Sequence, residues 1–154
     1  MRALGLLLAV LSVAAPVAAT DDDNAPLPEV AAALSRIRDA TNIEITTIGR
    51  KSGKPHSKPS WYVVDDGRVY VQSGKDGKTD WYLNLQKTPA VTLKADRYSF
   101  RARGRTITDR KDVERVHALF RDKYTSARLL SWVGSGIGQG LPVELTVDSV
   151  SIAR

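Results

Sequence analysis

The sequence contains no cysteine. This absence excludes disulfide bridges, thiolate metal sites and the attachment of lipid to a cysteine near the N-terminus. Histidine is also scarce: only His56 and His117 are present, which argues against a histidine metal site. The chain must therefore be stabilised by its own apolar core. Its 154 residues are enough for one domain with such a core.

Several functional signatures are missing as well. The phosphate loop Gly-x4-Gly-Lys-Ser/Thr does not occur, and the glycine-rich segment 134–140, GSGIGQG, lacks the spacing Gly-x-Gly-x-x-Gly. That segment precedes a predicted strand, so we interpret it as a loop. No serine has the histidine and acid partners of a hydrolase. Aromatic residues make up 6% of the chain and form no stacking repeat, which argues against nucleic-acid binding.

The only long apolar run lies at the N-terminus. Residues 1–19 have a short cationic start at Arg2, an apolar run over 3–13, and small residues at Val17 and Ala19. This layout is typical of a secretory signal peptide that is cleaved after Ala19. The run is shorter than the ~20 residues of a membrane span. We expect an exported protein, periplasmic or extracellular, without a stable membrane span; a retained amphiphilic anchor is the alternative.

The rest of the chain predicts an acidic, proline-bearing linker over 20–28 and one folded domain over 29–154. Residue periodicity and caps predict helices over 29–40, 80–87, 110–124 and 126–134. Val30, Leu34 and Ile37 form the apolar face of the first helix, Thr79 or Asp80 can cap the second, and Asp109 caps the third. Alternating apolar residues predict strands over 43–49, 60–65, 68–74, 90–95, 98–108 and 142–150. Asp66-Gly67 is a strong hairpin signal between two of them. Consecutive hairpins favour a mainly β, α+β fold: an antiparallel barrel or sheet of six strands with flanking helices.

The connection between the first two strands is unusually basic. Residues 49–58 contain four cations and no acidic residue. The cations are Arg50, Lys51, Lys54 and Lys58. Gly49 and Gly53 let the backbone approach a ligand closely, and Ser52 adds a hydrogen-bond donor. Together these groups can hold a phosphate. The alternative is a solvated basic loop, because runs of like charge are commonly solvent-exposed.

A second cluster occurs over 72–85, QSGKDGKTDWYLNL. Ser73 ends a strand beside a glycine and a lysine, and a helix then starts near residue 80. The free N–H groups of a helix N-terminus favour an anion. Trp81 and Leu85 are spaced i, i+4 and fit the core, whereas the amide of Asn84 can reach an anion. For Lys75 and Lys78, simple solvent exposure is the alternative.

These segments resemble the deazaflavin-dependent nitroreductase family, which belongs to the superfamily of flavin-binding split β-barrels. The resemblance extends over about residues 43–108. It depends on three pieces: TTIGRKSGKP, the strand-end SGK, and DWYLNL before a proline. It implies a six-stranded split barrel that holds coenzyme F-420, a deazaflavin with a phosphate and an oligoglutamate tail. Family members pass hydride from the reduced coenzyme to quinones, nitroaromatics and similar acceptors.

The resemblance also implies which residues bind. The implied cofactor-binding residues are Arg50, Lys51, Ser52, Gly53, His56, Ser73, Gly74, Lys75, Trp81 and Asn84. Lys51 is expected to supply charge to the phosphate and Ser73 to lie beside the ring, with no side chain as an obligatory acid or base. Trp61 and Tyr124 are expected on the substrate side. His56 stands where the family commonly has arginine, and a histidine cannot make a bidentate phosphate contact.

Three kinds of function are therefore compared. The first is an oxidoreductase that uses coenzyme F-420, or FMN as an alternative, to reduce a small electron acceptor. The second is an exported, non-catalytic split-barrel protein that binds a flavin, haem or another anionic small molecule. The third is a basic surface protein that recognises nucleic acid or lipid headgroups, favoured by the formal net charge of +6. A homodimer is expected because split barrels of this superfamily often pair.

Overall fold

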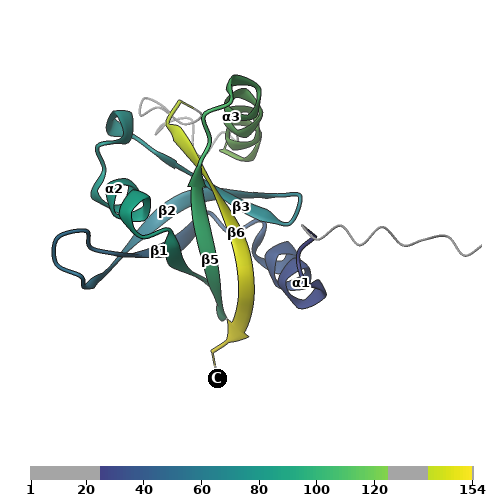
Figure 1. The fold of residues 1–154 in the computed structure, drawn as a ribbon. Helices are drawn as coiled ribbons and strands as arrows, with labels where there is room; N and C mark the ends of the chain where they lie inside the picture. Colours follow the sequence, from purple (N-terminus) through teal and green to yellow (C-terminus); the bar gives the residue numbers. More distant parts are fainter. Residues whose placement is uncertain (1–24, 125–138, 154) are drawn as a thin grey trace, which may run out of the picture.

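A closed β-barrel forms the centre of the protein, and three α-helices pack around it (Figure 1). The computed structural model describes residues 25–124 and 139–153. The predicted signal peptide, the predicted helix over 126–134 and most of the glycine-rich segment lie outside the described residues. The predicted fold, mainly β with flanking helices and a six-stranded antiparallel barrel, is confirmed.

The barrel is built from consecutive hairpins. Its strands are β1 (Asn42–Ile48), β2 (Pro55–Asp65), β3 (Arg68–Ser73), β4 (Ala90–Ala95), β5 (Tyr98–Thr106) and β6 (Leu141–Ile152). Their order around the barrel is β1-β2-β3-β6-β5-β4, and every neighbouring pair is antiparallel. The last strand closes the barrel by pairing with both β3 and β5, so each described strand has a neighbouring strand on both sides.

The helices cover different parts of the barrel. They are α1 (Pro28–Ile37), α2 (Asp80–Lys87) and α3 (Arg110–Tyr124), with a short 3-10 turn, η1 (Lys75–Gly77), before α2. In Figure 1, α2 lies at the end of the barrel next to β1 and β2, whereas α3 and α1 lie on other sides. The α2 helix contacts β1 and β5, which brings it against the basic connection.

Two apolar clusters result from the alternation of side chains along the strands. The main cluster fills the barrel and includes Val30, Leu34 and Ile37, the face predicted for α1. A second cluster lies outside the barrel, where Val116 and Phe120 of α3 pack on outward-facing residues of β2 and β3. The first cluster holds α1 against the barrel interior, and the second holds α3 against the outer surface of the barrel.

Local signals in the sequence predicted two features accurately. Asp66 and Gly67 both have positive φ, 47° and 68°, as a two-residue hairpin of the predicted kind requires. The carboxylate of Asp109 accepts hydrogen bonds from the backbone N–H groups of Lys111 and Asp112 at 2.9 and 3.2 Å. This is the predicted cap of α3.

The start of β2 differs from the prediction. The strand begins at Pro55, five residues before the predicted start at Ser60, and pairs with β1 from Pro55 to Trp61. Two prolines suggested a loop, but Pro59 lies where β2 has a partner on one side alone, since pairing with β3 starts at Tyr62. A proline without an N–H group is tolerated there. The loop between β1 and β2 is therefore short, and His56 and Lys58 project from a strand.

The remaining boundaries are close to the expected ones. The α1 helix covers 28–37 instead of 29–40, and β5 ends at Thr106 instead of 108. Within the described ranges, none of the helices combines the length and the apolar character needed to span a bilayer.

Candidate functional site

Two pockets adjoin each other where α2 meets the basic connection. The first has a volume of about 450 Å³; it is lined by Thr47, Gly49, Arg50, Lys51, Ser52, His56, Ser57, Lys58, Asp80, Trp81 and Asn84. The second has a volume of about 300 Å³; it is lined by Asn42, Lys58, Pro59, Ser60, Trp61, Gln72, Gly74, Thr79 and Trp81. We call them the basic pocket and the indole pocket. Lys58 and Trp81 line both, so the two pockets are neighbours that share a wall.

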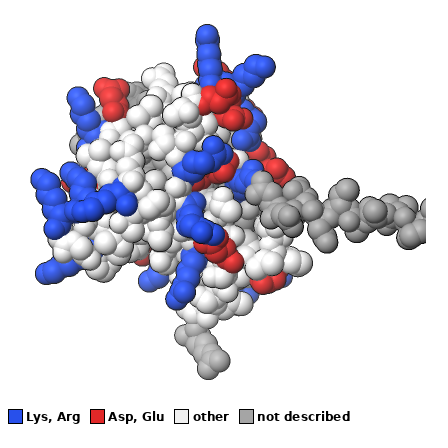
Figure 2. All heavy atoms as spheres, viewed as in Figure 1, with Lys and Arg blue, Asp and Glu red and all other residues white. Residues whose placement is uncertain are grey.

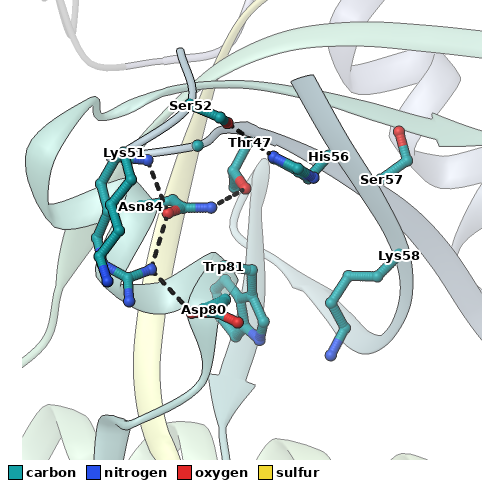
Figure 3. Close-up of a pocket in the computed structure, with 11 residues that line it drawn as sticks. Thr47, Lys51, Ser52, His56, Ser57, Lys58, Asp80, Trp81 and Asn84 are labelled. Atoms are coloured by element: carbon teal, nitrogen blue, oxygen red, sulfur yellow. Dashed lines mark hydrogen bonds and ion pairs between the residues drawn. The ribbon is translucent and has the colours of Figure 1, made fainter. Parts of the chain in front are cut away.

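Arg50 is held at the basic pocket by α2. Its backbone N–H donates to Asn84 Oδ1 at 3.0 Å, and its Nη1 donates to the same oxygen at 3.1 Å and to Asp80 Oδ1 at 2.9 Å. Lys87 Nζ donates to the backbone carbonyl of Arg50 at 2.8 Å. Asn84 is buried and donates in turn to Thr47 Oγ1 at 3.3 Å (Figure 3). These bonds connect the β1–β2 loop to the helix.

The loop itself is tight because of its glycines. The N–H of Gly49 donates to Lys54 O, and the N–H of Gly53 donates to Gly49 O, both at 2.8 Å. Gly53 has φ of +67°, a conformation that side chains rarely adopt. A Cβ on Gly49 would meet Ser52 Oγ at 2.4 Å and His56 Nε2 at 2.8 Å. Glycine at these two positions brings the cations to the pocket wall.

The basic pocket carries an excess of positive charge. Arg50, Lys51 and Lys58 line it against one carboxylate, Asp80. The guanidinium of Arg50 lowers the pKa of Asp80, mainly through the hydrogen bond between them. The carboxylate of Asp80 therefore stays ionised at neutral pH. Figure 2 shows Lys and Arg gathered on the side of the molecule where Figure 1 places the β1–β2 connection. The pocket is therefore suited to an anionic group.

His56 faces the same pocket from β2. Its Nε2 lies 3.1 Å from Ser52 Oγ, so the two side chains orient each other at the wall of the pocket (Figure 3). Both residues were predicted to bind the cofactor, and the structure places both beside Lys51 and Arg50 in the basic pocket.

The indole pocket combines two tryptophans with polar groups. Trp61 comes from β2 and Trp81 from α2, while Gly74 and Thr79 belong to the segment that connects β3 to α2. Trp81 is only 5% exposed and packs in the main core as well. It therefore has the structural role expected from its spacing and also forms the wall between the two pockets.

Ser73 reaches neither pocket with its hydroxyl. It is fully buried, donates to the carbonyl of Gly74 at 3.1 Å and lies 2.5 Å from Thr79 Oγ1. Of the two predicted caps of α2, Thr79 occupies the N-cap position, but its side chain makes no capping bond. Ser73 therefore contacts two residues that line the indole pocket, Gly74 and Thr79, without lining the pocket itself.

Tyr124 likewise lies behind the site. It is 2% exposed, and its hydroxyl accepts from the N–H of Tyr62 at 2.9 Å and lies within 2.9 Å of the carbonyls of Tyr62 and Thr41. Its ring centroid is 5.6 Å from that of Trp61, which does line the indole pocket. Of the two residues predicted on the substrate side, Trp61 lines a pocket and Tyr124 supports it.

Other predicted residues lie at the margin. Gly53 and Lys78 are exposed and line neither pocket. His117, expected at the core or its boundary, is half-buried, and its Nε2 lies 2.8 Å from the carbonyl of Gly140. Within the described part of the chain, no three histidine or acidic residues gather in a way that could hold a metal ion.

Some lining residues had no signal in the sequence. Thr47, Thr79 and Asp80 reach the site because β1 and α2 meet in space, and Gln72 reaches it because β3 lies beside β2. Lys58 was recognised as part of the basic run but not as a residue of the site. The alternation of β2, once its true start is known, places His56 and Lys58 on one face.

The fold and the site define a class: a six-stranded split barrel with a cationic pocket next to an aromatic one. Comparison with known families gives the same class. The profile of the F420H(2)-dependent quinone reductase family matches residues 29–145. The chain belongs to this family, and the protein is an oxidoreductase. The match covers α1, the five strands through β5, α3 and the start of β6.

Solved structures share the fold at low sequence identity. A conserved hypothetical protein from Mycobacterium tuberculosis is 18% identical, with a TM-score of 0.62 over 82% of this chain and 84% of that one. An F420-H2 dependent reductase is 21% identical, with a TM-score of 0.54 over 71% and 95%. The haem storage protein HutZ from Vibrio cholerae is 13% identical, with a TM-score of 0.59 over 80% and 94%.

Proposed function

We propose that the protein transfers hydride from reduced coenzyme F-420 to a small acceptor of the quinone or nitroaromatic type. The observation that carries this proposal is that a cationic pocket and an aromatic pocket lie next to each other and share Lys58 and Trp81. A ligand with an anionic tail and a planar ring needs such a pair of pockets. The family to which the chain belongs supports the same coenzyme.

The residues present fit this group. Arg50, Lys51 and Lys58 offer cations to a phosphate and to tail carboxylates, and the loop glycines leave room at the wall. Trp61 and Trp81 offer apolar surface to a ring. When bound, the reduced deazaflavin supplies the hydride. The protein binds the tail, orients the ring and limits access of water through the indole side chains.

Binding of the cofactor is tested with the purified protein. Oxidised coenzyme F-420 and, separately, FMN are titrated while the fluorescence of the ring is followed. We expect saturable binding of coenzyme F-420 that Lys51→Ala weakens by about tenfold or more, as for the loss of a charged hydrogen-bond partner. Lys111→Ala, on the exposed face of α3, is the matched control. If neither ligand binds, the proposal is contradicted. If FMN binds more tightly than coenzyme F-420, FMN is the cofactor.

Turnover separates an enzyme that uses this cofactor from a carrier. Reduced coenzyme F-420 is mixed with a soluble quinone, and oxidation of the cofactor is measured with and without protein. The carrier alternative includes haem, which the likeness to HutZ in fold brings into view. A haem titration followed by absorbance tests it, and tight haem binding without quinone turnover would favour that alternative.

We also propose that the protein acts after export. The support is the sequence of residues 1–19, which has the layout of a signal peptide. Expression in a bacterium with intact secretion, followed by N-terminal sequencing of the periplasmic fraction, is expected to give a chain that starts at Thr20. A chain that starts at Met1 and remains in the cytoplasm would contradict export.

A further inference from the structure

Another hollow lies on the outer surface of the barrel, and we call it the outer groove. Its volume is about 710 Å³, and it shares no lining residue with the basic pocket or the indole pocket. Volumes of about 300–1,000 Å³ are typical of sites for small organic molecules. Outward-facing side chains of β1, β4 and β5 form most of its lining: Thr46, Ile48, Ala90, Thr92, Arg101 and Arg103.

The strand register arranges part of this lining in a polar row that crosses the barrel. Arg101 of β5 is opposite Thr92 of β4, and Thr92 is opposite Thr46 of β1. Thr46 is opposite Ser57 of β2, and the hydroxyl oxygens of these two residues are 2.7 Å apart. This row contains hydroxyl groups and one guanidinium but no carboxylate.

A second row, two residues further along each strand, is apolar except for its arginine. Arg103 is opposite Ala90, and Ile48 is opposite Ala90 when the register of β1 and β4 is continued. Ile48 is in turn opposite Pro55 of β2. Ala90 and Pro55 are exposed and Ile48 is half-buried, so a ligand can reach this apolar surface. The side chains beside the arginines are short, which accounts for the hollow.

Of the three arginines on the outward face of β5, Arg101 alone forms no ion pair with a residue that the structure describes. Arg103 Nη2 donates to Asp148 Oδ1 at 3.0 Å, and Arg105 Nη2 donates to Glu144 Oε1 at 3.2 Å. Figure 2 shows Lys and Arg side chains, with a few acids beside them, over the strands that Figure 1 labels β5 and β6. Arg101 is exposed, so an anion can bind its guanidinium without displacing a carboxylate of the protein.

We propose that the outer groove binds a single-chain amphiphile with an anionic head group, of the class of free long-chain carboxylic acids. The carboxylate binds the guanidinium of Arg101, which can donate two parallel hydrogen bonds to it. The alkyl chain lies across the strands on Ala90, Ile48 and Pro55. Arg103 is already neutralised by Asp148, and its stem adds apolar surface. The inference does not depend on the proposed function, because the two sites share no lining residue.

Calorimetric titration with decanoate, below its micellar concentration, tests the site. Wild-type protein is expected to bind one decanoate per chain, and octanoate about tenfold more weakly, because two fewer methylene groups are buried. Acetate has the head group without the chain and is expected to show no saturable binding in the same range. Arg101→Gln is expected to weaken decanoate binding by about tenfold, the effect of a hydrogen bond between charged groups. Arg121→Gln, at an exposed position of α3, is the matched control.

Two further variants separate the outer groove from the basic pocket, which also attracts anions. Lys51→Ala is expected to keep full decanoate affinity, and Arg101→Gln to keep full affinity for coenzyme F-420. Ala90→Asp puts a carboxylate into the apolar row at an exposed position, so decanoate binding should be lost while the thermal midpoint stays near that of wild type. Decanoate binding that is lost in Lys51→Ala but kept in Arg101→Gln and Ala90→Asp would place the acid in the basic pocket and overturn the inference. Equal affinities for acetate and decanoate would overturn it as well.

Discussion

Arg50 lines the basic pocket, and its guanidinium already has partners within the protein. Its backbone and guanidinium are bound by Asn84, and its guanidinium also pairs with Asp80 at 2.9 Å. The carboxylate of Asp80 binds the same guanidinium that an anionic ligand in the basic pocket would bind. Asp80 is 85% exposed in its side chain, so solvent screens this pair. An incoming anion competes with Asp80 for Arg50.

Asp80→Asn is therefore expected to strengthen anion binding by roughly two- to fivefold at low salt, the range of an exposed ion pair. The reason is that the substitution removes a competing charge and leaves Arg50 in place. Inorganic phosphate and coenzyme F-420 are the ligands, measured by calorimetry at two salt concentrations. Asp122→Asn, an exposed position of α3, removes the same charge away from the site. Weaker binding in Asp80→Asn would show that Asp80 holds the ligand.

The same pair affects stability in a defined direction. Arg50 lowers the pKa of Asp80 below its ordinary value. A carboxylate with a lowered pKa contributes stability above its unfolded pKa, and this contribution is lost as the pH falls through the folded value. The pair thus favours the folded loop at neutral pH and weakens in acid.

Two substitutions of Asn84 are expected to affect stability and phosphate binding differently. In Asn84→Ala the N–H of Arg50 loses its acceptor, so the free energy of unfolding should fall by about 1–3 kcal/mol. In Asn84→Asp an acceptor remains, so stability should be largely kept, but the new charge should weaken phosphate binding. Urea unfolding and phosphate titration of both variants check this. Equal stability of Asn84→Ala and wild type would mean that the bond to Arg50 contributes little.

At the scale of elements, the position of α2 depends on a close contact with β5. Leu85 of α2 is buried and lies over Gly104, where a Cβ would meet Leu85 Cδ1 at 2.5 Å. The helix carries Asp80, Trp81 and Asn84 to the site. A small residue on β5 therefore sets the distance between the helix and the barrel.

Gly104→Ala is expected to destabilise the protein by about 1–3 kcal/mol, the usual effect of overpacking a core. It should also weaken phosphate binding, because α2 must shift. Adding Leu85→Ala removes the clash, so the double variant should lose less stability than the sum of the two single variants. Urea unfolding of the four proteins measures this coupling. Strict additivity would show that the strand and helix adjust independently.

At the scale of the whole molecule, a group of ionisable side chains at the contact between α3 and the barrel, two of them fully buried, sets the response to alkaline pH. Lys123 Nζ donates to Tyr62 O at 2.9 Å and lies 3.8 Å from the centre of the Tyr62 ring. Burial lowers the pKa of Lys123 to about 8. Burial also raises the pKa of Tyr124 to about 12, and that of Tyr62 above its ordinary value.

Stability is therefore expected to rise and then fall as the pH increases. Between pH 8 and about 10 the unfolded lysine binds more protons than folded Lys123, so stability rises with pH. Above about pH 10 the unfolded tyrosines lose protons first, so stability falls. Chemical unfolding across this range should show the rise in wild type and Lys111→Met but not in Lys123→Met. A rise that survives in Lys123→Met would assign it to another group.

The homodimer expected from the superfamily stays a prediction at this scale. Light scattering of the purified protein at several concentrations gives its mass directly. A mass of twice the chain is the expected result, and a single-chain mass at all concentrations would contradict it. The barrel and both pockets are complete within one chain, so binding to a monomer is physically reasonable.

The sequence predicted the elements whose signals are local. The hairpin at Asp66, the cap at Asp109 and the apolar face of α1 need only neighbouring residues, and all three are present. The start of β2 at Pro55 was missed because its tolerance for proline depends on which neighbouring strands pair with it. Gln72 was not recognised as a lining residue, because it reaches the indole pocket only where β3 lies beside β2 in space.

The common wall of Lys58 and Trp81 has a consequence for affinity. A molecule whose phosphate and ring are tethered occupies both cavities in one event, so the second half engages at a high effective concentration. The isolated ring and free phosphate lack this chelate advantage and should bind far more weakly, even when supplied together. Discrimination against unphosphorylated ring compounds would then follow from the architecture of the cleft without any further contact.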